Sequence, residues 1–405
     1  MNAICLVVDR LHVGHLGAYG NSWIETPAVD RLAGQAFVCD QALIDSPRLE
    51  RLYQSYWQGW HAAGSPEPSE GARSLAALLR DKGIHSALLT DEQLVARHPG
   101  AVDFDELIEI DPPWEPRSAE EIEQTHLAQC FVQILDWLQS AREPFLLWCH
   151  LAGLGTTWDA PLEFRRAYWE EGDPPPPESA HVPEGMLAED HDPDRLLGVA
   201  QSYAGQVSLL DTCLGALTEF CDDDPLGRQT VLALTSSRGF PLGEHRRVGP
   251  CDEALYGELV QVPLMLRFPD GLGEAGRSGA LVEPADLWAT LLECCGVGDL
   301  PPSPTAASLM PIVRRQGPRP RDRLCVVGEG TERAIRTPAW HLRAAARPEL
   351  FVKPDDRWEV NNVADRCRDV LEGLLDELTR YEQAIRSCRV AELPPLSGAL
   401  LSGLE

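Results

Sequence analysis

Short apolar runs alternate along this chain with segments of helical periodicity. The runs are rich in leucine and β-branched residues, which is typical of buried strands. We predict strands at residues 3–8, 85–89, 145–149, 230–234 and 262–268. Strands that alternate with amphipathic helices form a parallel sheet with crossover connections. The hydrophobic pattern therefore predicts an α/β fold in which a mainly parallel sheet is sandwiched by helices.

Two helices between these strands have clear signals in the sequence. Ser74 is expected to cap the first, because leucines recur on one face of the next residues and Gly83 lies beyond its end. The second is predicted over residues 122–138, where apolar residues recur at i, i+3 and i+4 spacing.

The C-terminal part of the chain has a different pattern. It contains the apolar run RLCVVGEG, then the run AIRTPAWHLRAAA, and then an amphipathic segment around residues 370–378. Short strands followed by one closing helix predict a small α+β subdomain. We therefore expect an α/β domain over residues 1–310 and a C-terminal subdomain over residues 311–405.

Charge and composition narrow the range of partners. The 405 residues include 63 acidic and 35 basic side chains, a formal net charge of −28. Such a surface repels phosphate backbones and anionic membranes, so neither nucleic acid nor a membrane is an expected partner. No apolar stretch approaches the ~18 residues of a membrane span, and Met1 leads directly into the first predicted strand. The twelve cysteines are scattered without CxxC spacing, which favours reduced thiols and a cytoplasmic location.

Polar residues and a glycine follow four of the predicted strands. Ligands of open α/β sheets bind beyond the carboxyl ends of the strands, so these positions are the candidates for chemistry. In strand order they are Asp9 and Arg10, then Asp91 and Gln93, then Gly155, and then Ser237 and Arg238.

Several stretches resemble the sulfatase family of the alkaline-phosphatase superfamily. The opening segment is LVVDRLHVGHLGAYGNSWIETPAVDRLAGQAF, and the later ones are EPFLLWCHLAGLGTTWDAP, SYAGQVSLLDTCLGAL, TSSRGFPLGEH, ELVQVPLMLRFP, PADLWATLLECCGV, AIRTPAWHL and LFVKPDDRWEVNNVAD. Their order and spacing follow the family along the whole chain. The resemblance implies an alkaline-phosphatase-like fold and hydrolysis of sulfuric esters. It also implies a divalent cation, usually calcium, a formylglycine nucleophile made from Cys or Ser, cationic groups that hold the anion, and histidines.

The nucleophile segment departs from that pattern. An ungapped match of residues 42–59 to the family segment puts Leu49 at the nucleophile and Tyr53 at an arginine. Leucine has no nucleophilic atom and cannot be modified into one. The frame of this segment is retained, since Gly59 still follows the helix, but its reactive residue is absent.

The metal-binding and anion-binding positions depart from the family as well. Asp9 keeps one acid of the expected pair, but Arg10 stands at the second. The remaining substitutions are Asp91 at a lysine, Gln93 at a histidine, Gly155 at a later histidine, Ser237 and Arg238 at a metal-binding Asp-His pair, and Pro250 at a second lysine. We therefore predict that the family's calcium site is lost and that no cofactor is bound.

The two inserted arginines suggest what replaces the metal. A guanidinium carries a permanent charge and five donors, so it can neutralise a buried carboxylate. We predict that Arg10 or Arg238 lies within about 4 Å of Asp9, the reach of an ion pair. The alternative is that Arg10, Arg238 and His245 face the cleft and contact an anionic ligand.

Three functions remain open from these residues. The first is an inactive pseudo-sulfatase that binds a small anionic ligand or a protein partner. The second is a remodelled, metal-free hydrolase of sulfate or phosphate esters. The third is a structural subunit that pairs with an active homologue.

Overall fold

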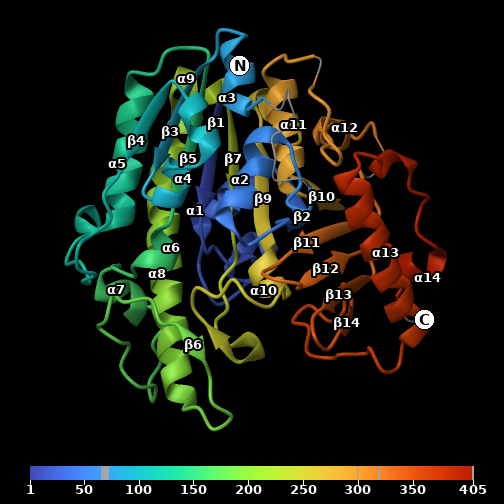
Figure 1. The fold of residues 1–405 in the computed structure, drawn as a ribbon. Coiled ribbons are helices and arrows are strands. Elements are labelled where there is room, and N and C mark those ends of the chain that lie inside the picture. The colour runs from blue at the N-terminus through green and yellow to red at the C-terminus, as the bar shows by residue number, and fades with distance from the viewer. Residues whose placement is uncertain (65–72, 299, 318–319, 404–405) are drawn as a thin grey trace.

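The computed structural model describes residues 1–64, 73–298, 300–317 and 320–403. Its centre is an eight-stranded sheet with the order β10-β2-β9-β7-β1-β5-β3-β4 (Figure 1). The strands are β1 (Asn2–Val8), β2 (Phe37–Leu43), β3 (His85–Thr90), β4 (Glu106–Glu109), β5 (Phe145–Leu151), β7 (Thr230–Thr235), β9 (Gln261–Arg267) and β10 (Gly276–Val282). Strand β9 runs antiparallel to β2 and β7, and the other described pairs are parallel. The predicted mainly parallel sheet is confirmed.

The five predicted strands are β1, β3, β5, β7 and β9, and three further strands were missed. Their sequences lack a continuous apolar run. Strand β2 carries half-buried Asp40 and Gln41, β10 begins with a glycine and contains another, and β4 is a short, mostly exposed edge strand. Such strands gain their order from their neighbours in the sheet more than from local pattern.

Helices cover both faces of this sheet (Figure 1). The side chains of β1 alternate between the two faces: Ala3, Cys5 and Val7 pack toward one cluster, and the residues between them pack toward the other. The first cluster is completed by α2 (Leu49–Gln58), α3 (Leu75–Arg80) and α11 (Pro284–Cys294). The second is completed by α1 (Pro27–Gln35), α5 (His126–Gln139) and α8 (Pro193–Asp223). All of β1 is buried, which explains its continuous apolar sequence.

The two predicted helices are present, with one change of boundary. The Ser74 side chain accepts a hydrogen bond from the backbone N–H of Ala77 and caps α3, as expected. The segment predicted as one helix over 122–138 begins with a short 3-10 turn, Ile122–Gln124, and α5 starts only after Thr125. Thr125 caps α5 through its side chain, and this separates the two pieces.

The C-terminal part forms a separate antiparallel sheet with a closing helix (Figure 1). Its strands are β11 (Leu324–Val327), β12 (Arg333–Arg336), β13 (Trp340–Ala344) and β14 (Glu349–Val352), and its main helix is α13 (Arg368–Arg386). Strand β11 joins the C-terminal sheet to the large sheet through its two faces. Leu324 and Val326 pack into the core of the large sheet. Cys325 and Val327 pack into the hydrophobic cluster under α13. The predicted small α+β subdomain is therefore present.

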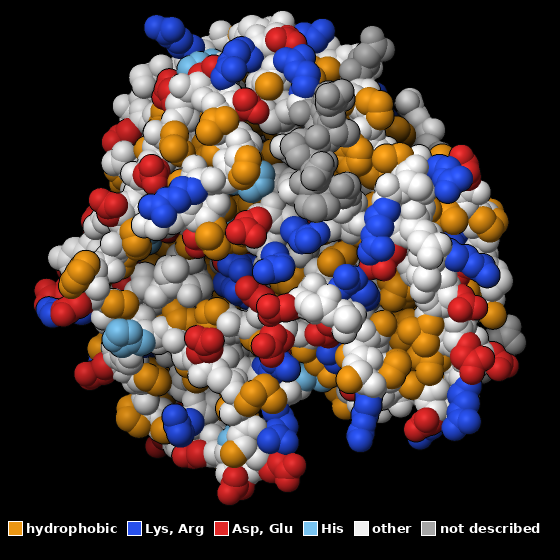
Figure 2. All heavy atoms as spheres, in the orientation of Figure 1, with side chains coloured by type: hydrophobic (Ala, Val, Ile, Leu, Met, Phe, Trp, Pro, Cys, Tyr) orange, Lys and Arg blue, Asp and Glu red, His pale blue; other side chains and the backbone are white. Residues whose placement is uncertain are grey.

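Short elements complete the fold. They are α4 (Gln93–Ala96), α6 (Gly153–Thr156), α7 (Leu162–Arg166), α9 (Pro225–Arg228), α10 (Gly257–Val260), α12 (Met310–Val313), α14 (Gly398–Leu401), β6 (Gly185–Met186) and β8 (Arg247–Val248). None of the described helices combines the length and hydrophobicity needed to cross a membrane. Figure 2 shows acidic and basic side chains spread over one face, and a notch at its lower edge between the region of β6 and the C-terminal sheet.

Candidate functional site

An ion pair joins the carboxyl ends of two neighbouring strands. Asp9 directly follows β1 and Arg238 lies three residues past β7, and the two strands are parallel, with Val7 opposite Thr235. The guanidinium of Arg238 donates from Nε to Asp9 Oδ1 at 3.0 Å and from Nη2 to Asp9 Oδ2 at 2.5 Å. This two-point contact confirms the predicted arginine–Asp9 pair. Both side chains are nearly inaccessible to solvent.

Arg10 and Asp252 extend the pair into a network of four charges. Arg10 Nη2 donates to Asp252 Oδ1 at 2.7 Å, and Arg238 Nη1 donates to Asp252 Oδ2 at 2.9 Å. Arg10 Nε lies 3.8 Å from Asp9 Oδ2. The two guanidinium groups and the two carboxylates, which we call the strand-end network, have no net charge. Sequence reasoning missed Asp252, because its only signal is an acid two residues past Pro250 in a loop.

The electrostatics of the strand-end network keep it ionised. Burial alone would raise the pKa of Asp9, but the charges of Arg238 and Arg10 outweigh it and hold that pKa well below its usual range. Burial likewise disfavours the charged form of Arg238, yet Asp9 and Asp252 raise its pKa. Ser237 Oγ adds a hydrogen bond of 2.5 Å to Asp9 Oδ1. Both carboxylate oxygens of Asp9 therefore accept hydrogen bonds from this chain.

Gly155 makes room for the strand-end network. A Cβ atom at this position would lie 2.9 Å from Cγ of Arg10, closer than real Cβ contacts. Arg10 itself has a φ of 65°, which is uncommon for a residue other than glycine. A side chain at residue 155 and the observed position of Arg10 therefore exclude each other, so the two departures from the sulfatase pattern are physically coupled.

Leu49 and Tyr53 lie on α2, beside the strand-end network. Leu49 is the first residue of the helix and is buried in the core cluster that includes Leu52. The hydroxyl of Tyr53 lies 2.6 Å from Nδ1 of His150, the penultimate residue of β5. Both partners are fully buried, and burial lowers the pKa of His150. The sequence did not predict this contact.

The sulfatase family model matches residues 1–297. The chain belongs to the sulfatase family. It is 23% identical over 370 residues to human iduronate 2-sulfatase, covering 72% of this chain and 65% of that enzyme. It is 30% identical over 123 residues to an N-acetylglucosamine-6-O-sulfatase of Bacteroides thetaiotaomicron, covering 30% of this chain and 21% of that protein. The chain thus spans less than two thirds of the length of these relatives.

A solved structure supports the same fold. The phosphonate monoester hydrolase of Agrobacterium radiobacter superposes with a TM-score of 0.75 at 17% identity, covering 97% of this chain and 96% of that one. At this identity the likeness concerns architecture alone. It agrees with the predicted alkaline-phosphatase-like arrangement of a large helix-flanked sheet and a smaller C-terminal sheet.

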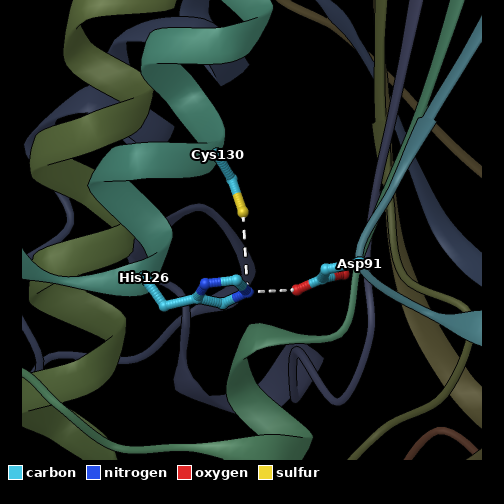
Figure 3. Close-up of side chains that lie close together, drawn as sticks. All are labelled: Asp91, His126 and Cys130. Atoms are coloured by element: carbon cyan, nitrogen blue, oxygen red, sulfur yellow. Dashed lines mark hydrogen bonds and ion pairs between the residues drawn. The ribbon is translucent and has the colours of Figure 1, made fainter. Parts of the chain in front are cut away.

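Asp91, at a lysine position of the sulfatase pattern, is directed to helix α5 (Figure 3). Its Oδ2 lies 2.8 Å from Nε2 of His126, and its Oδ1 accepts a hydrogen bond from the backbone of Ala152. Cys130 Sγ lies 3.7 Å from the same imidazole nitrogen (Figure 3). Gln93 begins α4 and is exposed. The acid at this position therefore ties β3 to α5 and β5.

The cluster of Asp91, His126 and Cys130 offers ligand atoms within 4.8 Å of one another. Carboxylate, imidazole and thiolate are ligands that zinc accepts. Both Asp91 and Cys130 contact the same nitrogen, so the cluster differs from a catalytic relay, which uses the two imidazole nitrogens separately. The sequence analysis did not predict this cluster. The signal for it was the i, i+4 spacing of His126 and Cys130, which places both side chains on one face of α5.

His245 and Pro250 lie in the loop between β7 and α10. The imidazole of His245 is held at both nitrogens, by Glu258 Oε1 at 2.7 Å and by the backbone oxygen of Glu359 at 3.0 Å, and it stacks on Tyr256. Burial works against protonation of His245, but Glu258 outweighs it and raises its pKa. Pro250 is half-buried and supplies no charge.

Proposed function

We propose that this sulfatase-family chain acts by binding a ligand or partner and not by hydrolysing a sulfate ester. The strand-end network carries the proposal. Arginine cannot lose its proton under physiological conditions, so Arg10 and Arg238 remain as fixed positive charges beside Asp9. A divalent cation at Asp9 would have to displace both of them. An anion there would compete with two carboxylates, and the contact predicted for Arg10, Arg238 and His245 stays a prediction.

The position of Leu49 supports the same proposal. The family mechanism requires an oxygen nucleophile on the residue at this position, and the leucine side chain supplies none. Its side chain packs in the core, between the exposed residues Arg48 and Glu50. We propose that Leu49, Tyr53, Asp91, Gln93, Gly155 and Pro250 are former site positions that now serve the fold.

The names of the relatives suggest the class of ligand. An iduronate sulfatase and an N-acetylglucosamine sulfatase point to anionic sugars, and we propose such a molecule, or a protein that carries one, as the partner. The twelve cysteines are free thiols, which supports a reducing, cytoplasmic location. We further propose the boundary near residue 310 as the division between the α/β domain and the C-terminal subdomain.

Turnover of an aryl sulfate tests the proposal. Purified protein should give no rate above a blank, with or without calcium, and Leu49→Cys should not restore one because the metal and anion positions also differ. Ser237→Ala serves as the site variant, since it removes one hydrogen bond to Asp9 and is expected to cost less stability than a change of Asp9 itself. A rate that scales with protein, survives repurification and falls in folded Ser237→Ala would instead support the remodelled, metal-free hydrolase.

Calcium titration gives an independent measurement. Calorimetry with calcium or magnesium should show no saturable heat, because Asp9 already accepts from Arg238 and Ser237. Saturable binding in the micromolar range that disappears in Asp9→Ala would contradict the replacement of the metal by arginine.

A further inference from the structure

A cavity lies between the large sheet and the C-terminal subdomain, away from the strand-end network. Its volume is about 340 Å³. The walls come from β2, β10 and β12, from the 3-10 turns Val13–His15 and Gly17–Tyr19, and from the segment 353–358. None of Asp9, Arg10, Leu49 or Arg238 is among the residues that line it. A cavity of about this size holds a small molecule such as a monosaccharide derivative.

Positive charge is concentrated around this cavity. The cationic side chains in its lining are Arg277, Arg336, Lys353 and Arg357, and the acidic ones are Asp40 and Glu258. The whole chain has the opposite balance, with a net charge of −28. Cations gathered in a cleft of an acidic protein raise the local concentration of anions.

Arg336 is a buried guanidinium in the wall of this cavity and has no carboxylate partner. It is 4% exposed, it donates from Nη2 to the side-chain oxygen of Gln41 at 2.6 Å, and its Nε has no acceptor among the described residues. In the described part of the chain no carboxylate lies within ion-pair distance of it. Burial lowers the pKa of Arg336 to about 10, and the more distant Glu359 compensates only in part. A buried guanidinium without an acid is costly unless a ligand supplies the negative charge.

The other three cationic side chains of the lining, unlike Arg336, have carboxylate partners or are exposed to solvent. Lys353 is paired with Glu359 at 2.8 Å, and Arg277 is paired with Asp40 at 2.6 Å. Arg357 donates to the backbone oxygen of Tyr19 and is exposed. Arg336 is therefore the anchor, and Arg277 and Arg357 lie exposed at the rim of the cavity.

We propose that this cavity binds a small molecule through a sulfate, phosphate or carboxylate group held by Arg336. Arginine presents parallel donors that match such oxyanions. The indole of Trp358 is exposed, lines the same cavity and offers a flat surface to the rest of the ligand. The site does not depend on whether the strand-end network has lost its activity.

Calorimetry at constant ionic strength tests this site. Sodium sulfate, sodium phosphate and sodium glucuronate are titrated separately, with sodium chloride as the reference, so that the three sources of the oxyanion are distinguished. At least one should bind saturably. Arg336→Met should weaken that binding at least about tenfold, the loss expected for a charge-assisted anchor. Arg31→Gln is the matched control: this exposed arginine pairs with Asp222, lies outside the cavity, and should leave binding unchanged.

If Arg336→Met does not fold, substitutions of two exposed arginines at the rim still test the proposal. Arg357→Gln and Arg277→Gln should each weaken binding about threefold, a smaller loss because these side chains remain partly in water. The proposal is overturned if none of the three anions binds saturably. It is also overturned if a folded Arg336→Met variant binds as tightly as the wild type or, where that variant does not fold, if binding is unchanged in both rim variants. Because no turnover is measured, a failure here does not bear on the proposed absence of sulfate ester hydrolysis.

Discussion

The strand-end network and the cavity both contain buried guanidinium groups, and the two regions differ in how the charge is neutralised. In the strand-end network, Arg10 and Arg238 contact Asp9 and Asp252, so charge is balanced within the chain. In the cavity, the one side-chain hydrogen bond of Arg336 within the described residues is to the amide oxygen of Gln41. The positive charge of arginine is thus balanced by carboxylates in the strand-end network and is left unbalanced in the cavity. A buried arginine indicates a ligand only where the chain provides no acid.

The two regions also differ in how they arose within the sulfatase frame. The strand-end network depends on several substitutions that need one another, as the contact between Arg10 and Gly155 shows. The cavity lies between two subdomains, where β12 and the segment 353–358 meet β2 and β10. Binding sites commonly occur at such junctions. The binding proposed at this junction therefore does not require a ligand at the strand ends.

Asp9→Asn should have the largest effect on stability. It leaves two buried guanidinium groups with Asp252 as their only acid, and breaking a buried ion pair in this way costs about 3–5 kcal/mol. Denaturant unfolding should therefore show a much lower midpoint. The double variant Asp9→Asn, Arg238→Met should recover part of the loss, because it removes a charge that the single variant leaves unpaired. Additive losses in the double variant would contradict the pairing.

Glu359→Gln should cause the next largest loss of unfolding free energy. The variant also makes the cavity region more positive. Glu359 pairs with Lys353 and accepts from the backbone of Gly257. Burial raises the pKa of Glu359, but His341 and Lys353 outweigh it and lower the pKa from 4.5 to about 2. At about 1.4 kcal/mol per pH unit, this shift gives an upper limit of about 3.5 kcal/mol. The contribution at neutral pH is smaller, because burial lowers the pKa of His341 to about 4 and its charge is then absent.

The pH dependence of the Glu359 effect has a defined sign. Its folded pKa lies below its unfolded value, so its contribution is complete above about pH 4.5 and is lost as the pH falls toward 2. The difference in unfolding free energy between wild type and Glu359→Gln should therefore be constant from pH 7 to 5 and shrink below 4.5. A difference that grows on acidification would show that Glu359 is not ionised in the folded state.

Ser237→Ala should weaken the strand-end network by a smaller amount. The hydroxyl of Ser237 donates to Asp9 Oδ1, and hydrogen bonds to charged groups contribute about 1.5–3 kcal/mol. Arg238 still holds the same oxygen at 3.0 Å, so we expect a loss near the lower limit. Ser46→Ala is the matched control, since Ser46 is also buried but donates to a backbone oxygen. If both variants lost the same unfolding free energy, the negative charge of Asp9 would not strengthen the hydrogen bond from Ser237.

The sequence predicted the sheet, the C-terminal subdomain and the Asp9 ion pair because each has a local signal. Apolar runs mark β1 and β5, and the resemblance placed Asp9, Arg10 and Arg238 at neighbouring strand ends. Asp252, His126 and Arg336 were not predicted as site residues. Their roles depend on contacts with residues far along the chain, and a loop acid, a helix histidine and a strand arginine look ordinary in isolation. The cavity was not predictable for the same reason, since it exists only once the two subdomains pack.

Arg336→Met should have the smallest effect, and its sign separates the two regions. In a buffer without oxyanions, the variant removes an uncompensated buried charge and retains much of the apolar stem, so the protein should be unchanged or up to about 1 kcal/mol more stable. Arg238→Met should instead be destabilising, because it leaves Asp9 with fewer donors. Adding the oxyanion that binds best should then raise the melting temperature of wild type but not of Arg336→Met, since a ligand stabilises only the folded state that binds it. If Arg336→Met were as destabilising as Arg238→Met without any anion, an internal partner would compensate Arg336, and the contrast between the two regions would not hold.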